Sequence, residues 1–262
     1  MILDQFKLDD KVCLVTGASR GIGRGIAQGF AEAGAHVVGA ARTPETLEEM
    51  VEQVRGLGRR ALAVPCDVND PSSLDALVEK TIQEFGRIDV LVNNAGGTPP
   101  TPLLQLKDAA FEEAFHFNVT TAMHLSRECV RHMVERGEGG AIVNISSGLS
   151  HLVEPGFVAY GTAKAALSHM TRLMAHELAP HVRVNALAVG ATLTDALGMF
   201  LNDDIQRQMC ELTPMGRLGS VEDIAQAALY LASPASSWMT GKILEIDGGT
   251  VASNWPIKIP AF

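Results

Sequence analysis

The sequence predicts one α/β domain that spans all 262 residues, a doubly wound parallel sheet with helices on both faces. The first observation is alternation, because short runs rich in β-branched residues are followed along the whole chain by longer segments with helical periodicity. The second is that the short runs are almost continuously apolar, as strands buried on both faces are. The third is that no linker, repeat or low-complexity segment divides residues 1–262, so we expect a single domain.

The first strand, predicted at residues 11–16, runs directly into a glycine-rich turn, Gly17-Ala18-Ser19-Arg20-Gly21-Ile22-Gly23. A helix with apolar residues at helical spacing follows and stops at Gly34. Glycines let the backbone approach a pyrophosphate, and a helix N-terminus presents free N–H groups to it. The spacing is T-G-x-x-x-G-x-G rather than G-x-G-x-x-G, and an isolated cluster of glycines is more often an ordinary turn. Between a strand and a helix, we interpret it as a dinucleotide-binding loop.

The second strand, predicted at residues 36–41, ends where a protein that binds an unmodified ribose would carry Asp or Glu. Here the residues are Ala41 and Arg42. Arg42 and Arg20 of the glycine turn would bring two guanidinium groups to a 2′-phosphate, whose geometry suits them. We therefore predict NADP(H) as the cofactor. The alternative is that Arg42 only lies in solvent before the helix that begins near Pro44.

The alternation continues to the end of the chain. Further strands are predicted at residues 61–65, 88–92, 141–145, 182–187 and 242–246. Further helices are predicted at about residues 71–85, 108–133 and 221–232, and over the alanine-rich segment after Tyr160. A long span before residue 221 is predicted to be irregular.

Composition excludes several classes of function. The net charge is −9, from 21 basic and 30 acidic residues without a basic block, which argues against nucleic acid or an anionic membrane as the main partner. The four cysteines are far apart and form no C-x-x-C pair, so neither a metal site nor a disulfide framework is expected. No signal peptide is visible, and no run approaches the roughly 18 apolar residues of a membrane span. We expect a cytoplasmic protein.

A stretch around Tyr160 carries side chains suited to proton transfer. Tyr160 and Lys164 are four residues apart on a predicted helix and therefore share one face, and Ser147 follows a predicted strand. A phenol has an ordinary pKa of about 10, which a nearby ammonium lowers. Tyr160 would then exchange a proton with an alcohol or carbonyl oxygen that Ser147 holds. By spacing alone, the two helical residues are more often simple neighbours.

With these elements placed, the sequence resembles the short-chain dehydrogenase/reductase family over almost its whole length. Residues 16–23 are similar to the cofactor loop of the family, and residues 93–96 to its N-N-A-G segment. Asn118, Ser147, Tyr160 and Lys164 match its catalytic tetrad in order. Ser147 precedes Tyr160 by 13 residues, the usual gap in the family, which favours it over Ser146. The resemblance implies a Rossmann fold and an oxidoreductase.

The resemblance also implies roles for the tetrad. Tyr160 would be the acid/base and Ser147 the clamp on the substrate oxygen. Lys164 would bind the nicotinamide ribose and lower the pKa of the tyrosine, and Asn118 would hold a water in a proton relay. The alternative for Asn118 is a hydrogen bond to backbone at a helix kink.

The resemblance assigns a larger set to the cofactor. Asp67 would meet the adenine amine, or else merely cap a helix, and Leu193 and Thr194 would meet the carboxamide. The implied cofactor-binding residues are Gly17, Ser19, Arg20, Gly21, Ile22, Gly23, Ala41, Arg42, Asp67, Val68, Asn94, Ala95, Gly96, Tyr160, Lys164, Gly190, Leu193 and Thr194.

One departure from the family concerns the loop under the nicotinamide. The family usually has Pro-Gly after the sixth strand, whereas this chain has Val189-Gly190. Because valine restores a backbone N–H and frees φ, we expect a less rigid loop.

The span from about residue 191 to 217 is expected to form a lid over the substrate. It is apolar and rich in methionine, with Leu193, Leu197, Met199, Phe200, Met209, Leu212 and Met215. An apolar lid favours a hydrophobic alcohol or ketone over a sugar, although the same residues would also pack a short helix onto the core. Segments 97–100, 190–197 and 233–238 are similar to the bacterial 7α-hydroxysteroid dehydrogenase branch, and 3-oxoacyl-carrier-protein reductases share most of the motifs.

The end of the chain and one helix suggest assembly. The helix after Tyr160 is apolar on more faces than one core contact needs, and the family uses it in homotetramer interfaces, so we expect a homotetramer, with a dimer as the alternative. The hydrophobic tail, residues 255–262, is expected to pack on a neighbouring subunit or beside a pocket mouth.

The leading hypothesis is an NADP(H)-dependent oxidoreductase that acts on a hydrophobic secondary alcohol or ketone, with a hydroxysteroid-like substrate favoured. A 3-oxoacyl-thioester reductase is the alternative within the family. A cofactor-binding protein without catalysis, or a lyase or epimerase on the same fold, remains a further hypothesis.

Overall fold

The computed structural model describes residues 1–199, 201–257 and 259, and it contains one seven-stranded sheet. The strands are β1 (Val12–Thr16), β2 (His36–Ala41), β3 (Ala61–Pro65), β4 (Val90–Asn93), β5 (Gly140–Ser147), β6 (Val182–Val189) and β7 (Ile243–Ile246). Their order is β3-β2-β1-β4-β5-β6-β7, and every neighbouring pair is parallel. The predicted doubly wound parallel sheet in a single domain is confirmed.

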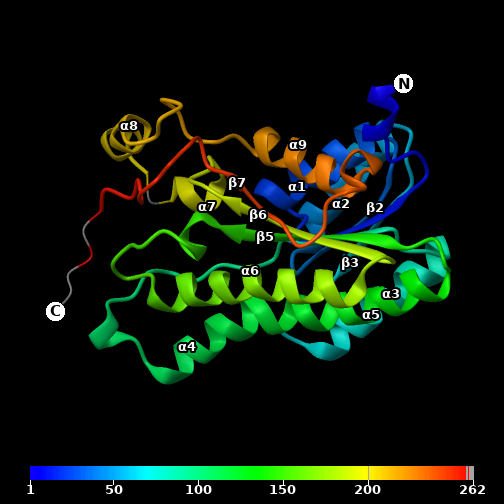
Figure 1. The fold of residues 1–262 in the computed structure, drawn as a ribbon, viewed down its shortest axis with the longest axis horizontal. Coiled ribbons are helices and arrows are strands. Elements are labelled where there is room, and N and C mark those ends of the chain that lie inside the picture. Colours follow the sequence, from blue (N-terminus) through cyan, green and yellow to red (C-terminus); the bar gives the residue numbers. More distant parts are fainter. Residues whose placement is uncertain (200, 258, 260–262) are drawn as a thin grey trace.

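Helices cover both faces of this sheet (Figure 1). One layer contains α1 (Gly21–Glu32), α2 (Pro44–Gly56) and α9 (Val221–Ala232), and the other α3 (Pro71–Phe85), α4 (Asp108–Phe115), α5 (Thr121–Glu135) and α6 (Val158–Leu178). Side chains of β1 alternate between the two layers, since Cys13 and Val15 join the first core and Val12 and Leu14 the second. Burial on both faces explains why the strands are continuously apolar.

Several helix ends follow directly from local sequence. Asp70 caps α3 by accepting a hydrogen bond from Ser72 N at 3.0 Å, and Pro71 occupies the first helical position, where its missing N–H costs nothing. Gly86 ends the same helix in the left-handed conformation, at φ 74°. Ser220 and Asp223 form a reciprocal capping box at the start of α9. Such caps are why the predicted boundaries of α3 and α9 coincide with the observed ones.

Two predicted strands were too short. β5 extends through Ser147 and β6 through Val189, because the two strands pair in register as far as Ser147 opposite Val189. Val189 also pairs with Ile246 of β7 and is buried. The residue in place of the usual proline therefore ends a strand that is paired on both sides, and the lower rigidity expected for the loop after it stays a prediction.

The span predicted to be irregular contains two helices, α7 (Asp195–Gly198) and α8 (Asp203–Glu211). Asn202 caps α8 by accepting a hydrogen bond from Ile205 N at 2.9 Å, and two aspartates follow it in the first turn. This start signal was present in the sequence and was missed. Phe200, one of the expected lid residues, lies outside the described residues. Within the part of the chain that the structure describes, no helix is long and apolar enough to cross a membrane.

Candidate active site

The predicted site residues converge at the carboxyl edge of the sheet, where the loops after β1 and β4 leave in opposite directions. The sheet order changes direction between these two strands, and open α/β sheets bind ligands at such a switch point. The ends of β5 and β6 lie next along the same edge. Parallel pairing therefore brings together motifs that are widely separated in the sequence.

The glycine turn after β1 is held by the loop after β4. Asn94 Nδ2 donates to Thr16 O at 2.8 Å and to Gly17 O at 3.3 Å. Thr16 Oγ1 accepts hydrogen bonds from the backbone N–H groups of Asn94 and Ala95, each at 3.0 Å. Asn94 was predicted to line the adenosine and ribose side of the cofactor, but its amide is occupied by the turn, so its side chain acts as a positioning group.

Close packing explains why this turn needs glycine. Gly17 has φ +65°, which side chains rarely adopt, and a Cβ at Gly23 would lie 2.3 Å from Gly17 O. A Cβ at Gly21 would touch the methyl group of Thr194 at 3.5 Å. Thr194 therefore lies against the start of α1, and the structure brings together the two ends of the predicted cofactor site.

The ends of β2 and β3 carry the residues predicted to select the cofactor. Arg20 and Arg42 are exposed, and among the described residues neither guanidinium has a hydrogen bond or ion pair. Ala41 is half-buried, and its carbonyl accepts from Cys66 N at 2.9 Å. Two free guanidinium groups beside a glycine cradle at a helix N-terminus fit a phosphorylated dinucleotide.

The residues predicted to contact the adenine, Asp67 and Val68, lie just after β3. Val68 is buried, whereas Asp67 is exposed and its Oδ1 accepts from Asn69 N at 3.0 Å in a local turn. The cap of α3 is Asp70, so the alternative that Asp67 caps this helix is wrong. Ser19 and Ala95 are half-buried, and Ile22 packs against the core of the first layer.

Lys164 lies in α6 with its ammonium group buried. Nζ donates to Ile145 O at 2.8 Å, and the residue is 3% exposed. Burial lowers the pKa of Lys164 to about 8, because the charged form loses its hydration. A Cβ at Gly96 would lie 2.9 Å from Lys164 Nζ and 2.7 Å from Asn118 Oδ1. Gly96 therefore lies against both polar groups, and a residue with a side chain would not fit at this position.

Tyr160 and Ser147 are hydrogen-bonded to each other near Lys164. Burial raises the pKa of the Tyr160 phenol, and a hydrogen bond with Ser147 opposes that rise by a smaller amount. The expected lowering by Lys164 is not found, because the ammonium is bonded to the Ile145 carbonyl and lies 5.7 Å from the centre of the tyrosine ring. Leu149 N donates to Ser147 Oγ at 3.2 Å, and the serine hydroxyl proton is donated to Tyr160, since the bond between them favours the phenolate.

Asn118 lies in η3 (His116–Thr120), a π-helical turn between α4 and α5. Its Nδ2 donates to Ala114 O at 2.8 Å, and its Oδ1 accepts from Gly97 N at 2.9 Å. The structure therefore shows the alternative, a side chain bonded to backbone at a helix irregularity, and the water relay through Asn118 stays a prediction. π-Turns of this kind recur at functional sites. Here the turn fixes the loop that carries Gly96 and Gly97.

The loop after β6 supplies the remaining predicted contacts. A Cβ at Gly190 would lie 2.6 Å from the Cα of Asp247, so the backbone immediately after β7 requires glycine here. Leu193 is 44% exposed, and Leu193 N donates to Gly219 O at 2.8 Å. Thr194 Oγ1 accepts from Leu197 N at 3.3 Å, so the hydroxyl caps α7 and keeps its own proton to donate.

A buried polar network beneath the site was missed at the sequence level. Asn93 Nδ2 donates to Asn144 Oδ1 at 2.9 Å and to Ser126 Oγ at 3.0 Å, and Asn144 Nδ2 donates to Thr171 Oγ1 at 2.9 Å. These bonds tie β4 and β5 to α5 and α6. Ser146 adds a second tie, since its hydroxyl donates to the backbone carbonyl of Lys164 at 3.1 Å. The available signal was an asparagine inside an apolar strand, because buried amides need partners.

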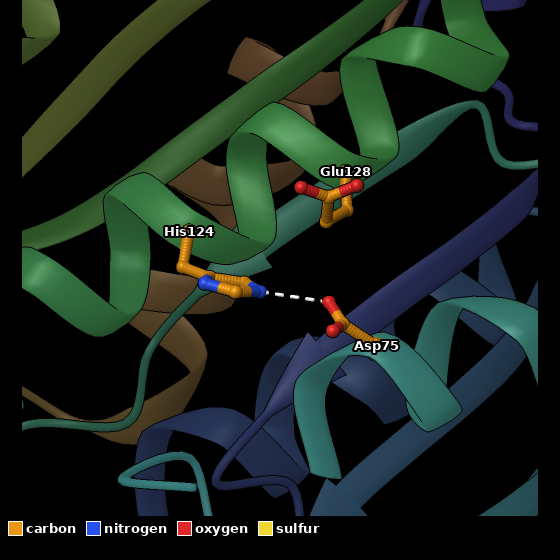
Figure 2. A group of neighbouring side chains, drawn as sticks. All are labelled: Asp75, His124 and Glu128. Carbon is orange, nitrogen blue, oxygen red and sulfur yellow. Dashed lines mark hydrogen bonds and ion pairs between the residues drawn. The ribbon is translucent and has the colours of Figure 1, made fainter. Parts of the chain in front are cut away.

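A second polar cluster joins α5 and α3 (Figure 2). In the described residues, Asp75, His124 and Glu128 form the one group of three with metal-ligand atoms near one another. His124 Nε2 bonds Asp75 Oδ1 at 2.8 Å between α5 and α3, and the two carboxylate oxygens of Glu128 face Arg127 at 2.8 Å and Arg131 at 3.2 Å. With both oxygens paired to arginine, the cluster is an ion-pair network that ties α5 to α3.

Comparison with known proteins identifies the family. A family model described as Enoyl-(Acyl carrier protein) reductase matches residues 17–251. The chain belongs to the short-chain dehydrogenase/reductase family. It is therefore an oxidoreductase of the kind that acts on CH–OH groups with a nicotinamide cofactor.

Individual relatives of this short-chain dehydrogenase/reductase cover nearly the whole chain. An uncharacterized oxidoreductase of Mycobacterium tuberculosis is 49% identical over 99% of both chains. The 7α-hydroxysteroid dehydrogenase of Escherichia coli is 41% identical over 95% of this chain and 97% of its own. A 3-oxoacyl-[acyl-carrier-protein] reductase of Thermotoga maritima is 36% identical over 94% of this chain and 99% of its own.

A solved structure agrees with these relatives. A 7α-hydroxysteroid dehydrogenase in complex with NADH and 7-oxo glycochenodeoxycholic acid has a TM-score of 0.92 and 41% identity, covering 95% of this chain and 97% of its own.

Proposed function

We propose that this chain is an NADP(H)-dependent oxidoreductase that interconverts a hydrophobic secondary alcohol and its ketone, with a fused-ring, hydroxysteroid-like substrate favoured. The observation that carries the proposal is the convergence of Ser147, Tyr160 and Lys164 beside the glycine turn. The relatives support this class of substrate, because one of them is a 7α-hydroxysteroid dehydrogenase and its solved counterpart holds a steroid ketone.

The choice of NADP(H) rests on charge at the end of β2. No acidic side chain follows Ala41, and the exposed guanidinium groups of Arg42 and Arg20 would be available to a ribose 2′-phosphate. The similar 7α-hydroxysteroid dehydrogenase structure contains NADH, so the phosphate preference is a property proposed for this chain from its own residues.

The bound nicotinamide would supply or accept the hydride. Tyr160 would donate its phenolic proton to the carbonyl oxygen during reduction and recover one from the alcohol during oxidation. Ser147 would hold the same oxygen by turning its hydroxyl proton from Tyr160 to the substrate. Lys164, whose ammonium keeps donors beyond the one given to Ile145, would bind the ribose hydroxyls. Asn118 would act by positioning the Gly96–Gly97 backbone.

The protonation state of Tyr160 favours reduction. Because burial raises the pKa of its phenol, the side chain is protonated at neutral pH and ready to act as an acid. Oxidation of an alcohol needs the phenolate, so it should gain rate as the solution becomes alkaline.

Residues 191–217 would form a lid over the substrate. Four apolar residues between 191 and 217 are exposed, namely Leu193, Met199, Leu212 and Met215. An exposed apolar group beside a site suits a substrate that shields it from water. We also propose a homotetramer, and a cytoplasmic location.

Replacing Tyr160 by Phe removes the acid and keeps the ring. We expect turnover with NADPH and a steroid ketone to fall by about a hundredfold to ten-thousandfold, while NADPH binding is retained. Absorbance of NADPH measures turnover, and its fluorescence measures binding. A variant that keeps the wild-type rate would contradict the mechanism.

Replacing Arg20 and Arg42 by Ala tests the proposed preference for NADPH over NADH. We expect Kd for NADPH to rise by about tenfold or more, since one to three kcal/mol of charge-assisted bonding is lost. Kd for NADH should change little. Equal losses for both cofactors would count against the 2′-phosphate assignment.

The second candidate is a 3-oxoacyl-thioester reductase, favoured by the relative from Thermotoga maritima. A panel of steroid ketones, acyl thioesters and small cyclic ketones, followed by NADPH absorbance, separates the two. Product formed without net NADPH consumption would indicate an epimerase, and NADPH binding without product would indicate a protein that only binds the cofactor.

A further inference from the structure

A row of aromatic rings leads away from Tyr160. The ring of Phe157, at the start of α6, lies edge-on to Tyr160 with centroids 6.3 Å apart and planes at 63°. Trp255, from the end of the chain, meets Phe157 edge-on with centroids 6.0 Å apart and planes at 84°. Both contacts have the edge-to-face geometry that aromatic pairs prefer. The row therefore joins the proposed acid to the tail.

The end of the chain around Trp255 contacts two segments near the site, one after α8 and one before α6. On the lid side, Asn254 Nδ2 donates to Thr213 Oγ1 at 2.9 Å, just after α8. On the other side, a Cβ at Gly156 would lie 2.5 Å from Ile259 Cδ1, so this isoleucine rests on the backbone next to Phe157. Figure 1 shows the tail passing between α8 and the loop that enters α6. The predicted packing of the tail on a neighbouring subunit or beside a pocket mouth stays a prediction.

We propose that Trp255 is a specificity-determining residue, which with Phe157 forms an aromatic wall for the fused-ring skeleton of the substrate. This inference rests on the proposed function, because it takes the reacting carbonyl to lie at Tyr160. A carbonyl bound at Tyr160 sits at one end of the row, and the rest of the molecule extends along it.

The wall selects by size and shape. From the Tyr160 ring the contacts pass to Phe157, at 6.3 Å between ring centroids, and from Phe157 to Trp255, at 6.0 Å. A flat, apolar skeleton of several fused rings removes this aromatic surface from water, whereas a small cyclic ketone leaves Trp255 uncovered. Rigid aromatic groups suit this task, since little conformational entropy is lost when they bind. The tail thus supplies affinity for large ketones and does not take part in proton transfer.

The first experiment compares two ketones with Trp255→Ala. For a saturated steroid ketone we expect KM to rise about tenfold with little change in kcat, because the contact is equal in the ground and transition states. For cyclohexanone we expect kcat/KM to stay within about threefold of wild type. Trp255→Phe should recover most of the steroid KM. Equal losses on both ketones would overturn the proposal, because they would indicate a structural role for the tail.

The matched control uses the second of the two tryptophans in the chain. Trp238 is fully exposed, so Trp238→Ala should leave both ketones unaffected. In addition, Trp238→Phe leaves Trp255 as the one source of tryptophan emission.

The single-tryptophan protein gives a readout that is independent of turnover. Titration with the saturated steroid ketone, which does not absorb at these wavelengths, should change the emission of Trp255 in Trp238→Phe and leave Trp238 unchanged in Trp255→Phe. No change in Trp238→Phe would overturn the proposal. An emission change in a protein that reduces no ketone would instead contradict the proposed function while leaving the binding wall in place.

Discussion

Lys164 carries a buried ammonium whose hydrogen-bond partner is the Ile145 carbonyl. Placing a charge away from water costs free energy, and the lowered pKa of about 8 is the measure of that cost. A lysine kept in this environment is typical of a functional site, because the same group in solvent would make the fold more stable. Next to it, Gly96 has no space for a side chain between Lys164 and Asn118.

The pH dependence of stability should reveal this burial. From pH 8 to 10.5 the unfolded chain keeps the Lys164 proton more tightly than the folded chain, so Lys164 makes the unfolding free energy rise with pH across this window. Below pH 8 the cost is present in full and constant.

Lys164→Met removes the titration. We expect its stability advantage over wild type to shrink by about 3 kcal/mol from pH 8 to 10.5, measured by urea unfolding. The comparison of Lys164→Met with wild type removes the contribution of the buried cysteines to the pH dependence, because they titrate in both proteins. A constant difference across the window would show that Lys164 is not buried in solution.

At the scale of elements, the loop after β4 determines the shape of the loop after β1. The side-chain amide of Asn94 donates hydrogen bonds to the carbonyls of Thr16 and Gly17. The hydroxyl oxygen of Thr16 accepts hydrogen bonds from the backbone N–H groups of Asn94 and Ala95. The exchange holds the glycine turn open at the N-terminus of α1. Asn94, which was predicted as a cofactor contact, thus positions the glycine turn with its side-chain amide.

Asn94→Asp reverses this interaction, because a carboxylate would face two carbonyl oxygens. We expect Kd for NADPH to rise about tenfold or more, as the loss of a buried donor costs roughly one to three kcal/mol. Fluorescence titration with NADPH measures the effect. The matched control is Asn202→Asp, where the side chain acts as an acceptor in a helix cap and Asp serves equally well. Unchanged binding in Asn94→Asp would contradict the positioning role.

On the scale of the whole molecule, the layer formed by α4, α5 and α6 presents apolar side chains to solvent. Leu173 is 59% exposed, Phe115 40% and Met123 37%, and they come from the three different helices of this layer. Figure 1 shows these helices together on one face of the sheet. A shared apolar face of this kind is typical of an interface between copies of a chain.

Leu173→Glu should weaken the proposed homotetramer, because it places a charge in an apolar interface. We expect a lower molar mass by light scattering at micromolar concentration, with the secondary structure retained. Leu57→Glu is the control, since Leu57 is 43% exposed at the end of α2, in the opposite layer. A tetramer that survives Leu173→Glu, or one that never forms, would contradict the assignment of this face.

Local patterns were sufficient for the order of the strands and helices, for the glycine turn and for the shared helix face of Tyr160 and Lys164, whereas the choice of Ser147 came from the family resemblance. Apolar periodicity, helix caps and glycine spacing depend on residues within a few positions of one another, so the sequence by itself determined them. The resemblance to the dehydrogenase family added the order of the tetrad. The cap at Asn202 was equally local and was overlooked.

Contacts between distant segments were decided by the tertiary structure alone. The extension of β5 and β6 depends on strand pairing, and the occupied side chains of Asn94 and Asn118 depend on backbone brought from elsewhere in the chain. The direction of the Tyr160 pKa shift follows from burial, which spacing along a helix does not reveal. The position of Trp255 against Phe157, 98 residues apart, likewise exists only once the sheet has brought the end of the chain back to the site.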